Sequence, residues 1–190
     1  MSTATAKETN RVNGLDVAAL FGVIEEVKQD ATKAVVAFRV QSEWKGQTRS
    51  ETTVNSYRLA GKEIARRFKI SADEPLELLG ENTAPNPQEL LMAALNACIT
   101  VGYVAGAAVN GIVLSKLEIE TSGQLDLRGF LGIDGSVKPG YESIETVVRI
   151  SGSGTAEQFR EIHENVMKTS PNYFNISRPV RIDSRLIVED

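Results

Sequence analysis

The sequence has little of what builds disulfide frameworks or metal centres. Its 190 residues include one cysteine, Cys98, and one histidine, His163. A lone cysteine excludes an internal disulfide framework and is consistent with a reducing compartment. One Cys and one His are also too few for a conventional structural zinc site. We therefore expect a cytoplasmic protein without a bound metal.

An excess of basic charge is also missing. Lysine and arginine together number 21 against 25 aspartates and glutamates, which gives a formal net charge of -4. Binding that is driven by nucleic-acid phosphates or by an anionic membrane surface needs a basic field, which this chain lacks. We expect neither a nucleic acid nor a membrane as a partner.

Common catalytic and nucleotide-binding signatures are absent too. The sequence contains no G-x-x-x-x-G-K-[ST] loop, no G-x-S-x-G elbow and no H-E-x-x-H pair, so no cofactor is expected. The first residues are small and polar, without the apolar core of a secretory signal. We predict a flexible tail over residues 1–13, followed by a single domain over 14–190, which is long enough to bury a substantial core.

What the sequence does have is one long run without charge, from Leu90 to Ser115. Its length is sufficient for a membrane-spanning helix. Asn96, Thr100 and Asn110 interrupt it, however, and no cluster of Lys or Arg flanks it. We favour a helix that is buried on nearly all sides in a globular core.

Capping signals set the limits of this predicted helix. Asn86 is a suitable N-cap, and Glu89 lies in the first turn, where the helix dipole favours an anion. Gly111 supplies the stop. Gly102 and Gly106 form a G-x-x-x-G pair, which in water allows close packing in a core.

The remaining predicted elements fall into groups. Helical spacing predicts an accessory helix over 15–30 and a second helix over 154–171, opened by a capping box. Alternating apolar residues and turn signals predict extended segments over 34–44, 47–59, 64–71, 112–127, 144–151 and 179–190. Gly- and Pro-containing loops are expected over 72–86 and 128–141. Strands gathered in groups favour an α+β fold over a parallel doubly wound sheet.

Cys98 is the remaining candidate nucleophile. At 100° per residue, Leu91, Leu95 and Val101 share its broad face of the helix, so it lies on a packing surface. It stands about three turns beyond Asn86, where the dipole effect has faded, so activation of the thiol needs a cation from elsewhere. An inert buried thiol is the alternative, because free cysteine is among the most buried residue types.

Three stretches together carry a resemblance. "NPQELLMAALNACITVGYVAGA" places a Cys ten positions after Gln88 in a helix of small residues that opens with Asn-Pro. It resembles the central helix of the OsmC/Ohr family, the osmotically inducible protein C and organic hydroperoxide resistance proteins. The loop "DEPLELLGENTAPNP" and the helix end "MKTSPNYFNI" are similar to that family as well. The resemblance covers the chain from about Ala34 onward.

The resemblance implies an OsmC-like fold, in which antiparallel strands of both subunits wrap around the central helices of an intertwined homodimer. In active members a Cys on this helix attacks an organic hydroperoxide. An Arg stabilises the thiolate, a Glu orients that Arg, and a second Cys resolves the sulfenic acid. Cys98 matches the attacking Cys. The family also implies an external thiol of the dihydrolipoyl type as reductant.

Two positions depart from the family pattern. The resolving Cys stands before a Pro at the end of the second helix, where this chain has Ser170, and a serine cannot form the disulfide. The family Glu stands ten positions before the Cys, where this chain has Gln88. The neighbouring Glu89 is nine positions from Cys98 and points about 180° away around the helix, which makes it a poor substitute.

The arginine of the family and the substrate pocket have only candidates in this sequence. Arg49 is the first candidate for the arginine, with Arg66 and Arg67 as alternatives and surface solvation as the bland interpretation of each. Pocket candidates, for which ordinary packing is the alternative, are aromatic side chains near Cys98 and the sole histidine: Tyr103, Tyr173, Phe174 and His163. For His163, a satisfied interface histidine is favoured over a Ser-His catalytic pair with Ser170.

Two functions of different class follow. In the first, the protein is a one-cysteine peroxidase that reduces organic hydroperoxides through Cys98 with an external thiol. In the second, it has lost turnover and binds an apolar small molecule, or has a structural role in stress, at the same dimer pocket. An Arg within reach of Cys98 would favour the first, and a thiol sealed among Leu and Val side chains the second.

Overall fold

The computed structural model describes residues 11–189. They divide into two compact units, one up to Ala93 and one from Ala94 onward, and the division falls inside helix α2 (Pro87–Val109). Each unit is described here by itself, and the single domain expected over 14–190 stays a prediction. The expected tail lies mostly outside the described residues; Arg11–Val12 form strand β1, which pairs antiparallel with β2 (Leu15–Asp16).

The first unit begins with the expected accessory helix. This helix, α1, spans Val17–Gln29, and the Asp16 carboxylate caps it by accepting a hydrogen bond from the backbone N–H of Ala19 at 2.9 Å. A short 3-10 turn, η1 (Ala31–Ala34), leads from the helix into the sheet. The prediction of a helix over 15–30 is therefore confirmed.

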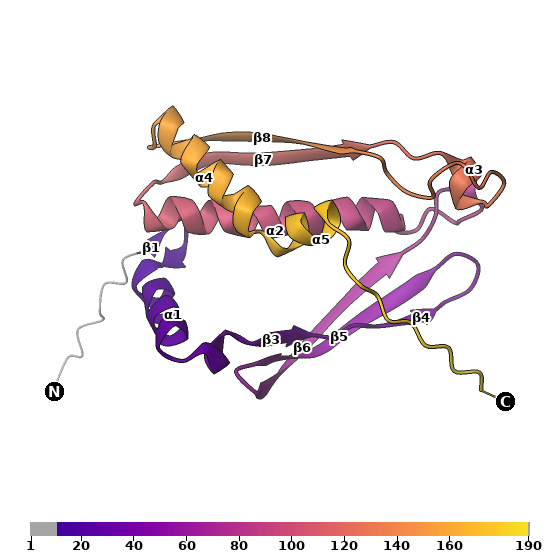
Figure 1. Cartoon of the computed structure of the whole chain (residues 1–190), viewed down its shortest axis with the longest axis horizontal. Coiled ribbons are helices and arrows are strands. Elements are labelled where there is room, and N and C mark those ends of the chain that lie inside the picture. The colour runs from indigo at the N-terminus through magenta and orange to yellow at the C-terminus, as the bar shows by residue number, and fades with distance from the viewer. Residues whose placement is uncertain (1–10, 190) are drawn as a thin grey trace. The chain divides into compact units, whose positions relative to one another are not determined.

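An antiparallel sheet follows in the first unit (Figure 1), and after it come the short 3-10 helix η2 (Leu76–Leu78) and the start of α2. Its strands are β3 (Val36–Phe38), β4 (Gln41–Trp44), β5 (Ser50–Leu59) and β6 (Lys62–Ala72). Both β3 and β4 pair with β5, and β6 pairs with β5 from end to end except at a register shift between Val54 and Ser56. The sheet confirms the predicted hairpin, although the first predicted strand, over 34–44, is divided into two.

The second unit pairs two strands with helices. A hairpin of β7 (Leu114–Gly123) and β8 (Ile144–Gly152) encloses a long loop that holds the one-turn helix α3 (Leu127–Phe130). Helix α4 (Ala156–Thr169) opens with the predicted capping box of Thr155 and Gln158, and helix α5 (Pro171–Ser177) follows it directly. Figure 1 shows the hairpin running alongside α2.

One apolar core joins these elements of the second unit. The buried members come from α2, the turn after it and α4: Leu95, Ile99, Tyr103, Ala107, Ile112, Ile162 and Val166. Apolar side chains of β7, β8 and α5 pack against them, among them Leu117, Val148 and Ile176. The core therefore lies between the helices and one face of the hairpin.

The glycine pair of α2 permits a close approach of α4. A Cβ atom at Gly102 would lie 3.0 Å from a methyl carbon of Val166, and one at Gly106 would lie 3.1 Å from a methyl carbon of Ile162. Both distances are shorter than ordinary van der Waals contact. The G-x-x-x-G pair therefore packs one core helix on another.

The expected burial of α2 is met in part within one chain, and one expected strand is not found. Helix α2 is not covered on nearly all sides within one chain, since Leu91, Val101 and Val109 are exposed, Val101 by 68%. Among the described residues it is the one helix long and apolar enough to cross a membrane, yet it supplies the core of the second unit. The prediction of a final strand over 179–190 is wrong. In the described structure, residues 179–189 pair with no other strand, and a strand needs such pairing for its backbone N–H and C=O groups.

Candidate functional site

The start of α2 is fixed by a reciprocal cap. The backbone N–H of Glu89 donates to Asn86 Oδ1 at 2.8 Å, and the backbone N–H of Asn86 donates to Glu89 Oε2, also at 2.8 Å. This capping box satisfies two backbone donors at the helix terminus. Glu89 therefore caps the start of α2. Gln88, beside it, is half-buried.

Cys98 lies three turns farther along α2 as a free, partly exposed thiol. It is not a member of the buried core, although its neighbours Leu95 and Ile99 are. Ser170 Oγ donates a hydrogen bond to Cys98 Sγ at 3.3 Å. Ser170 itself is buried, with 6% of its surface exposed. The structure thus brings together the thiol and Ser170, the residue that the sequence resemblance places at the resolving position.

Ser170 lies at the junction of α4 and α5 and belongs to both caps. Its backbone N–H donates to the carbonyl of Val166 at 2.9 Å and closes α4. Its Oγ accepts from the backbone N–H of Tyr173 at 3.3 Å and opens α5. Asn172 Nδ2, two residues on, donates to the carbonyl of Ala94 in α2 at 2.8 Å. The junction is therefore fixed to the helix that carries Cys98.

Tyr103 and His163 form the second polar contact between α2 and α4. The Tyr103 hydroxyl and His163 Nδ1 share a short hydrogen bond, and their rings stack at 6.1 Å between centroids. Tyr103 is fully buried, and this burial raises the pKa of its hydroxyl to about 12. His163 is exposed. His163 thus gives the buried Tyr103 hydroxyl a hydrogen-bond partner, as a buried tyrosine usually has.

The other two pocket candidates, Tyr173 and Phe174, lie on α5 and are exposed. The Arg178 guanidinium lies over the Phe174 ring, 5.4 Å from its centroid. The described contacts do not join these two rings to Tyr103 or His163. The four pocket candidates therefore fall into two separate places.

A polar network ties the middle of α2 to the hairpin. Thr121 Oγ1 donates to Asn96 Oδ1 at 2.6 Å, and Asn96 Nδ2 donates to the carbonyl of Ile119 at 3.4 Å. Thr121 also shares a hydrogen bond with Thr146 of β8. Asn96 precedes Cys98 by two residues, so the network fixes the helix against the sheet close to the thiol.

In the first unit, Arg49 is held by an acid that sequence reasoning missed. Its Nη1 forms an ion pair with Glu81 Oε2 at 2.9 Å, and its Nη2 donates to the carbonyl of Lys45 at 3.1 Å. The Arg49 Nε atom is buried without a hydrogen-bond partner. Of the alternatives, Arg66 places its guanidinium over the rings of Tyr57 and Phe68, where it makes cation–π contacts.

The loop that carries Glu81 is built around Asp73. This carboxylate is 1% exposed and accepts hydrogen bonds from the Thr48 hydroxyl at 2.7 Å, from both the hydroxyl and the backbone N–H of Thr83, and from the backbone N–H groups of Glu74 and Glu81. The Thr48 hydroxyl, followed by the Thr83 backbone, holds the pKa of Asp73 well below its usual range. No local sequence motif predicts the hydrogen-bonding role of Asp73, because its donors are up to 25 residues away.

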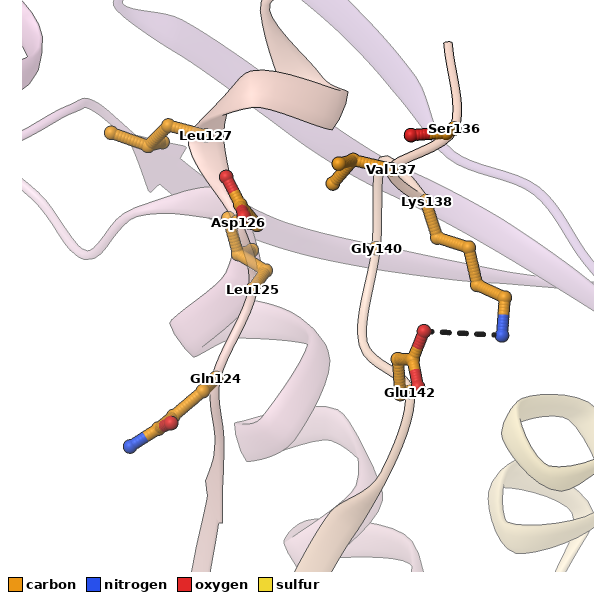
Figure 2. Close-up of a pocket in the computed structure, with 9 residues that line it drawn as sticks. All are labelled: Gln124, Leu125, Asp126, Leu127, Ser136, Val137, Lys138, Gly140 and Glu142. Carbon is orange, nitrogen blue, oxygen red and sulfur yellow. Dashed lines mark ion pairs between the residues drawn. The ribbon is translucent and has the colours of Figure 1, made fainter. Parts of the chain in front are cut away.

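A cavity of about 720 Å³ lies in the loop between β7 and β8. Figure 2 shows residues 124–127 facing residues 136–142 across it. Its charged groups are neutralised locally: Lys138 pairs with Glu142 at 3.3 Å, and Arg128 hydrogen-bonds Asp126 and lowers the pKa of that carboxyl to about 2. Neither Cys98 nor Ser170 lines this cavity. Within residues 11–189, no three His, Cys, Asp or Glu side chains converge as metal ligands.

Comparisons with known proteins agree with the sequence pattern. A family model described as OsmC-like protein matches residues 80–185. A crystal structure of an OsmC like protein from Mycoplasma pneumoniae is similar over 74% of this chain and 86% of that chain, with 17% identity and a TM-score of 0.56. A candidate osmotic stress induced and detoxification response protein from Psychrobacter arcticus is similar over 70% and 84%, with 13% identity and a TM-score of 0.53. Among curated proteins, none matches.

Proposed function

Because the chain belongs to the OsmC-like protein family and shares its α+β fold with a long central helix, we propose that it is a one-cysteine peroxidase. Its substrates are organic hydroperoxides, and Cys98 is the attacking residue. The observation that carries this proposal is the hydrogen bond between a partly exposed Cys98 thiol and the Ser170 hydroxyl. A thiol that serves packing alone needs neither access to solvent nor a polar neighbour.

The proposed oxidation is a displacement at oxygen. The Cys98 thiolate attacks the distal oxygen of the hydroperoxide, so that a sulfur–oxygen bond forms and the oxygen–oxygen bond breaks. The leaving alkoxide takes a proton from water and departs as an alcohol. Cys98 becomes a sulfenic acid, oxidised by two electrons, and the peroxide is reduced by the same two electrons.

An external thiol completes the cycle in this proposal. It attacks the Cys98 sulfenic sulfur, forms a mixed disulfide and releases water. A second thiol group, from the same dithiol or another molecule, then displaces Cys98 as a thiol and leaves as part of a disulfide. The external reductant is required because the chain has no second cysteine.

We assign the remaining candidate roles within the same proposal. Arg49, held by Glu81, is the cation that stabilises the Cys98 thiolate, and Glu81 replaces the orienting carboxylate that the chain lacks at Gln88. The ion pair of Arg49 and Glu81, and the capping contacts of Glu89, support this division of labour. Glu81 is itself positioned, through its backbone N–H, by the buried carboxylate of Asp73.

We also propose that the protein is an intertwined cytoplasmic homodimer. The support is apolar surface that one chain leaves exposed: Val101 on α2 and, on residues 179–189, Ile182, Leu186 and Val188. Exposed apolar surface of this extent is typical of a protein–protein interface. Sedimentation analysis is expected to find a dimer at micromolar concentration, and a well-folded monomer there contradicts this part of the proposal.

The activity is tested by treating the reduced protein with a bulky organic hydroperoxide and with hydrogen peroxide at equal concentrations. Trapping and mass spectrometry are expected to show sulfenic acid on Cys98, formed faster with the organic hydroperoxide. Added dithiol restores the thiol over repeated cycles. The control, Cys98→Ser, is expected to abolish turnover.

One outcome would sink the peroxidase proposal. If Cys98 in the folded protein reacts with none of several bulky hydroperoxides, and becomes reactive only after denaturation, the thiol has no catalytic role. The second interpretation, binding of an apolar small molecule or a structural role at the dimer pocket, would then take its place.

A further inference from the structure

We propose that Ser170 is a positioning residue for the reaction at Cys98, with its hydroxyl fixed as a hydrogen-bond donor to the sulfur. This inference rests on the proposed function and adds a role to it. Ser170 then does more than stand in for a missing cysteine: it donates a hydrogen bond to the attacking sulfur and keeps it in place.

The direction of the hydroxyl follows from its two contacts. The backbone N–H of Tyr173 can only donate, so Ser170 Oγ must accept in that hydrogen bond. The single hydroxyl hydrogen is therefore left for another acceptor, and Cys98 Sγ lies 3.3 Å away. Because a thiolate can only accept, this arrangement suits the ionised sulfur best.

The hydroxyl is also held rigidly. The backbone N–H and carbonyl of Ser170 both serve helix ends, the first with Val166 of α4 and the second with the N–H of Phe174 in α5. Asn172 fixes the same junction to α2 through the Ala94 carbonyl. A donor that is fixed before the reaction loses little entropy when the sulfur becomes charged. The same donor faces the oxidised sulfur of the sulfenic acid.

The consequence for the chemistry is a choice of reductant. A cysteine at position 170 would convert the sulfenic acid into a disulfide within the chain. The Ser170 hydroxyl cannot do so, and leaves the sulfenic sulfur of Cys98 open to an external thiol. Ser170 thus donates a hydrogen bond to the Cys98 thiolate but does not react with the Cys98 sulfenic acid.

The test is the pH profile of Cys98 alkylation by iodoacetamide, which needs no peroxide. Ser170→Ala removes the donor and is expected to move the profile to higher pH, because the ionised sulfur loses a hydrogen bond. Ser170→Asp keeps a strong N-cap for α5 but places a negative charge beside the sulfur, so a larger move in the same direction is expected. Ser170→Thr keeps the hydroxyl and is expected to restore the original profile.

Thr155→Ala is the matched control. It removes the N-cap of α4, whose Oγ1 accepts from Gln158 N at 3.2 Å, without touching the sulfur. It is expected to lower the melting temperature and leave the alkylation profile unchanged. If it moves the profile as far as Ser170→Ala does, the effect is general destabilisation and the positioning role is lost.

The remaining outcomes separate the two proposals. A folded Ser170→Ala protein with the original profile overturns the positioning role, even if the unaltered protein turns over hydroperoxides. If Ser170→Ala does not fold, an unmoved profile in Ser170→Asp overturns it instead. Shifted profiles in a protein that no hydroperoxide oxidises uphold the contact between Ser170 and Cys98 and reject the peroxidase.

Discussion

The two units of the chain bury their side chains in opposite ways. In the second unit, α2 and α4 seal an apolar core against one face of the hairpin. In the described part of the first unit, the buried side chains are Val17 and, more completely, the carboxylate of Asp73. Apolar side chains of its sheet stay exposed, among them Phe38, Phe68 and Ile70. Apolar contacts within the chain thus stabilise the second unit, whereas hydrogen bonds carry more of the first.

The largest effect is expected from breaking the apolar core. Ile99→Ala in α2 removes a fully buried side chain and is expected to lower the free energy of unfolding by roughly 2–5 kcal/mol. Its matched counterpart is Ile70→Ala in β6, where the side chain is exposed in one chain. If a second copy covers that sheet, the difference in melting temperature between Ile70→Ala and the original protein is expected to increase as the protein is diluted. Thermal unfolding at several protein concentrations checks both, and an Ile70→Ala effect independent of concentration contradicts coverage by a partner.

The polar centre of the first unit is broken by Asp73→Asn. Because five donors face this carboxylate, the melting temperature at pH 7 is expected to fall by roughly 5–10 °C. The folded pKa of Asp73 is lowered, so its contribution is fully present above the unfolded value of 3.8 and is lost as the pH falls through the folded one. The difference between the two proteins should therefore shrink below pH 4.

The control for Asp73→Asn is Glu142→Gln, which removes an exposed partner of Lys138. An exposed ion pair adds little stability, so the melting temperature is expected to stay within about 1 °C of the original. Melting curves that fall equally in both variants would show that Asp73 has no special place in the first unit.

The close packing of α2 on α4 is sharpened by Gly102→Val. The added side chain meets Val166 at once and is expected to cost about 1–3 kcal/mol of unfolding free energy through overpacking. Gly22→Val in α1 of the first unit is the matched control, since no atom lies within 4 Å of a Cβ there. It should stay within about 0.5 kcal/mol. Denaturant unfolding measures both, and equal losses would argue against helix contact as the cause.

The smallest expected effect is that of Tyr103→Phe. It removes the hydrogen bond to His163, and about 1 kcal/mol of stability is expected to be lost, because water can replace the phenol at the exposed imidazole. The raised pKa of Tyr103 means that its protonated form supports folding below pH 10 and that this support is lost as the pH rises towards 12. Alkaline unfolding should thus begin at higher pH in Tyr103→Phe, and an unchanged midpoint would contradict the assignment.

Local signals in the sequence were sufficient for most elements. The caps of α2 and α4 each lie within four residues, at Asn86 with Glu89 and at Thr155 with Gln158, and both predictions are confirmed. Helix α5 is not among the predicted elements, because the predicted helix over 154–171 ends at Pro171. The same proline is also a favourable first residue for a new helix, with Ser170 as its cap.

The sequence by itself determined that the chain cannot form an internal disulfide, that α2 carries no charge after Glu89, and that Ser170 follows α4. These properties depend on residue identity and on short-range spacing. Only the tertiary structure decided that Ser170 donates to Cys98 across 72 residues, that Glu81 holds Arg49, and that Val101 stays exposed. The physical reason is that such contacts form when elements pack against one another. Packing depends on side chains that are far apart in the chain, and local periodicity does not indicate which of them meet.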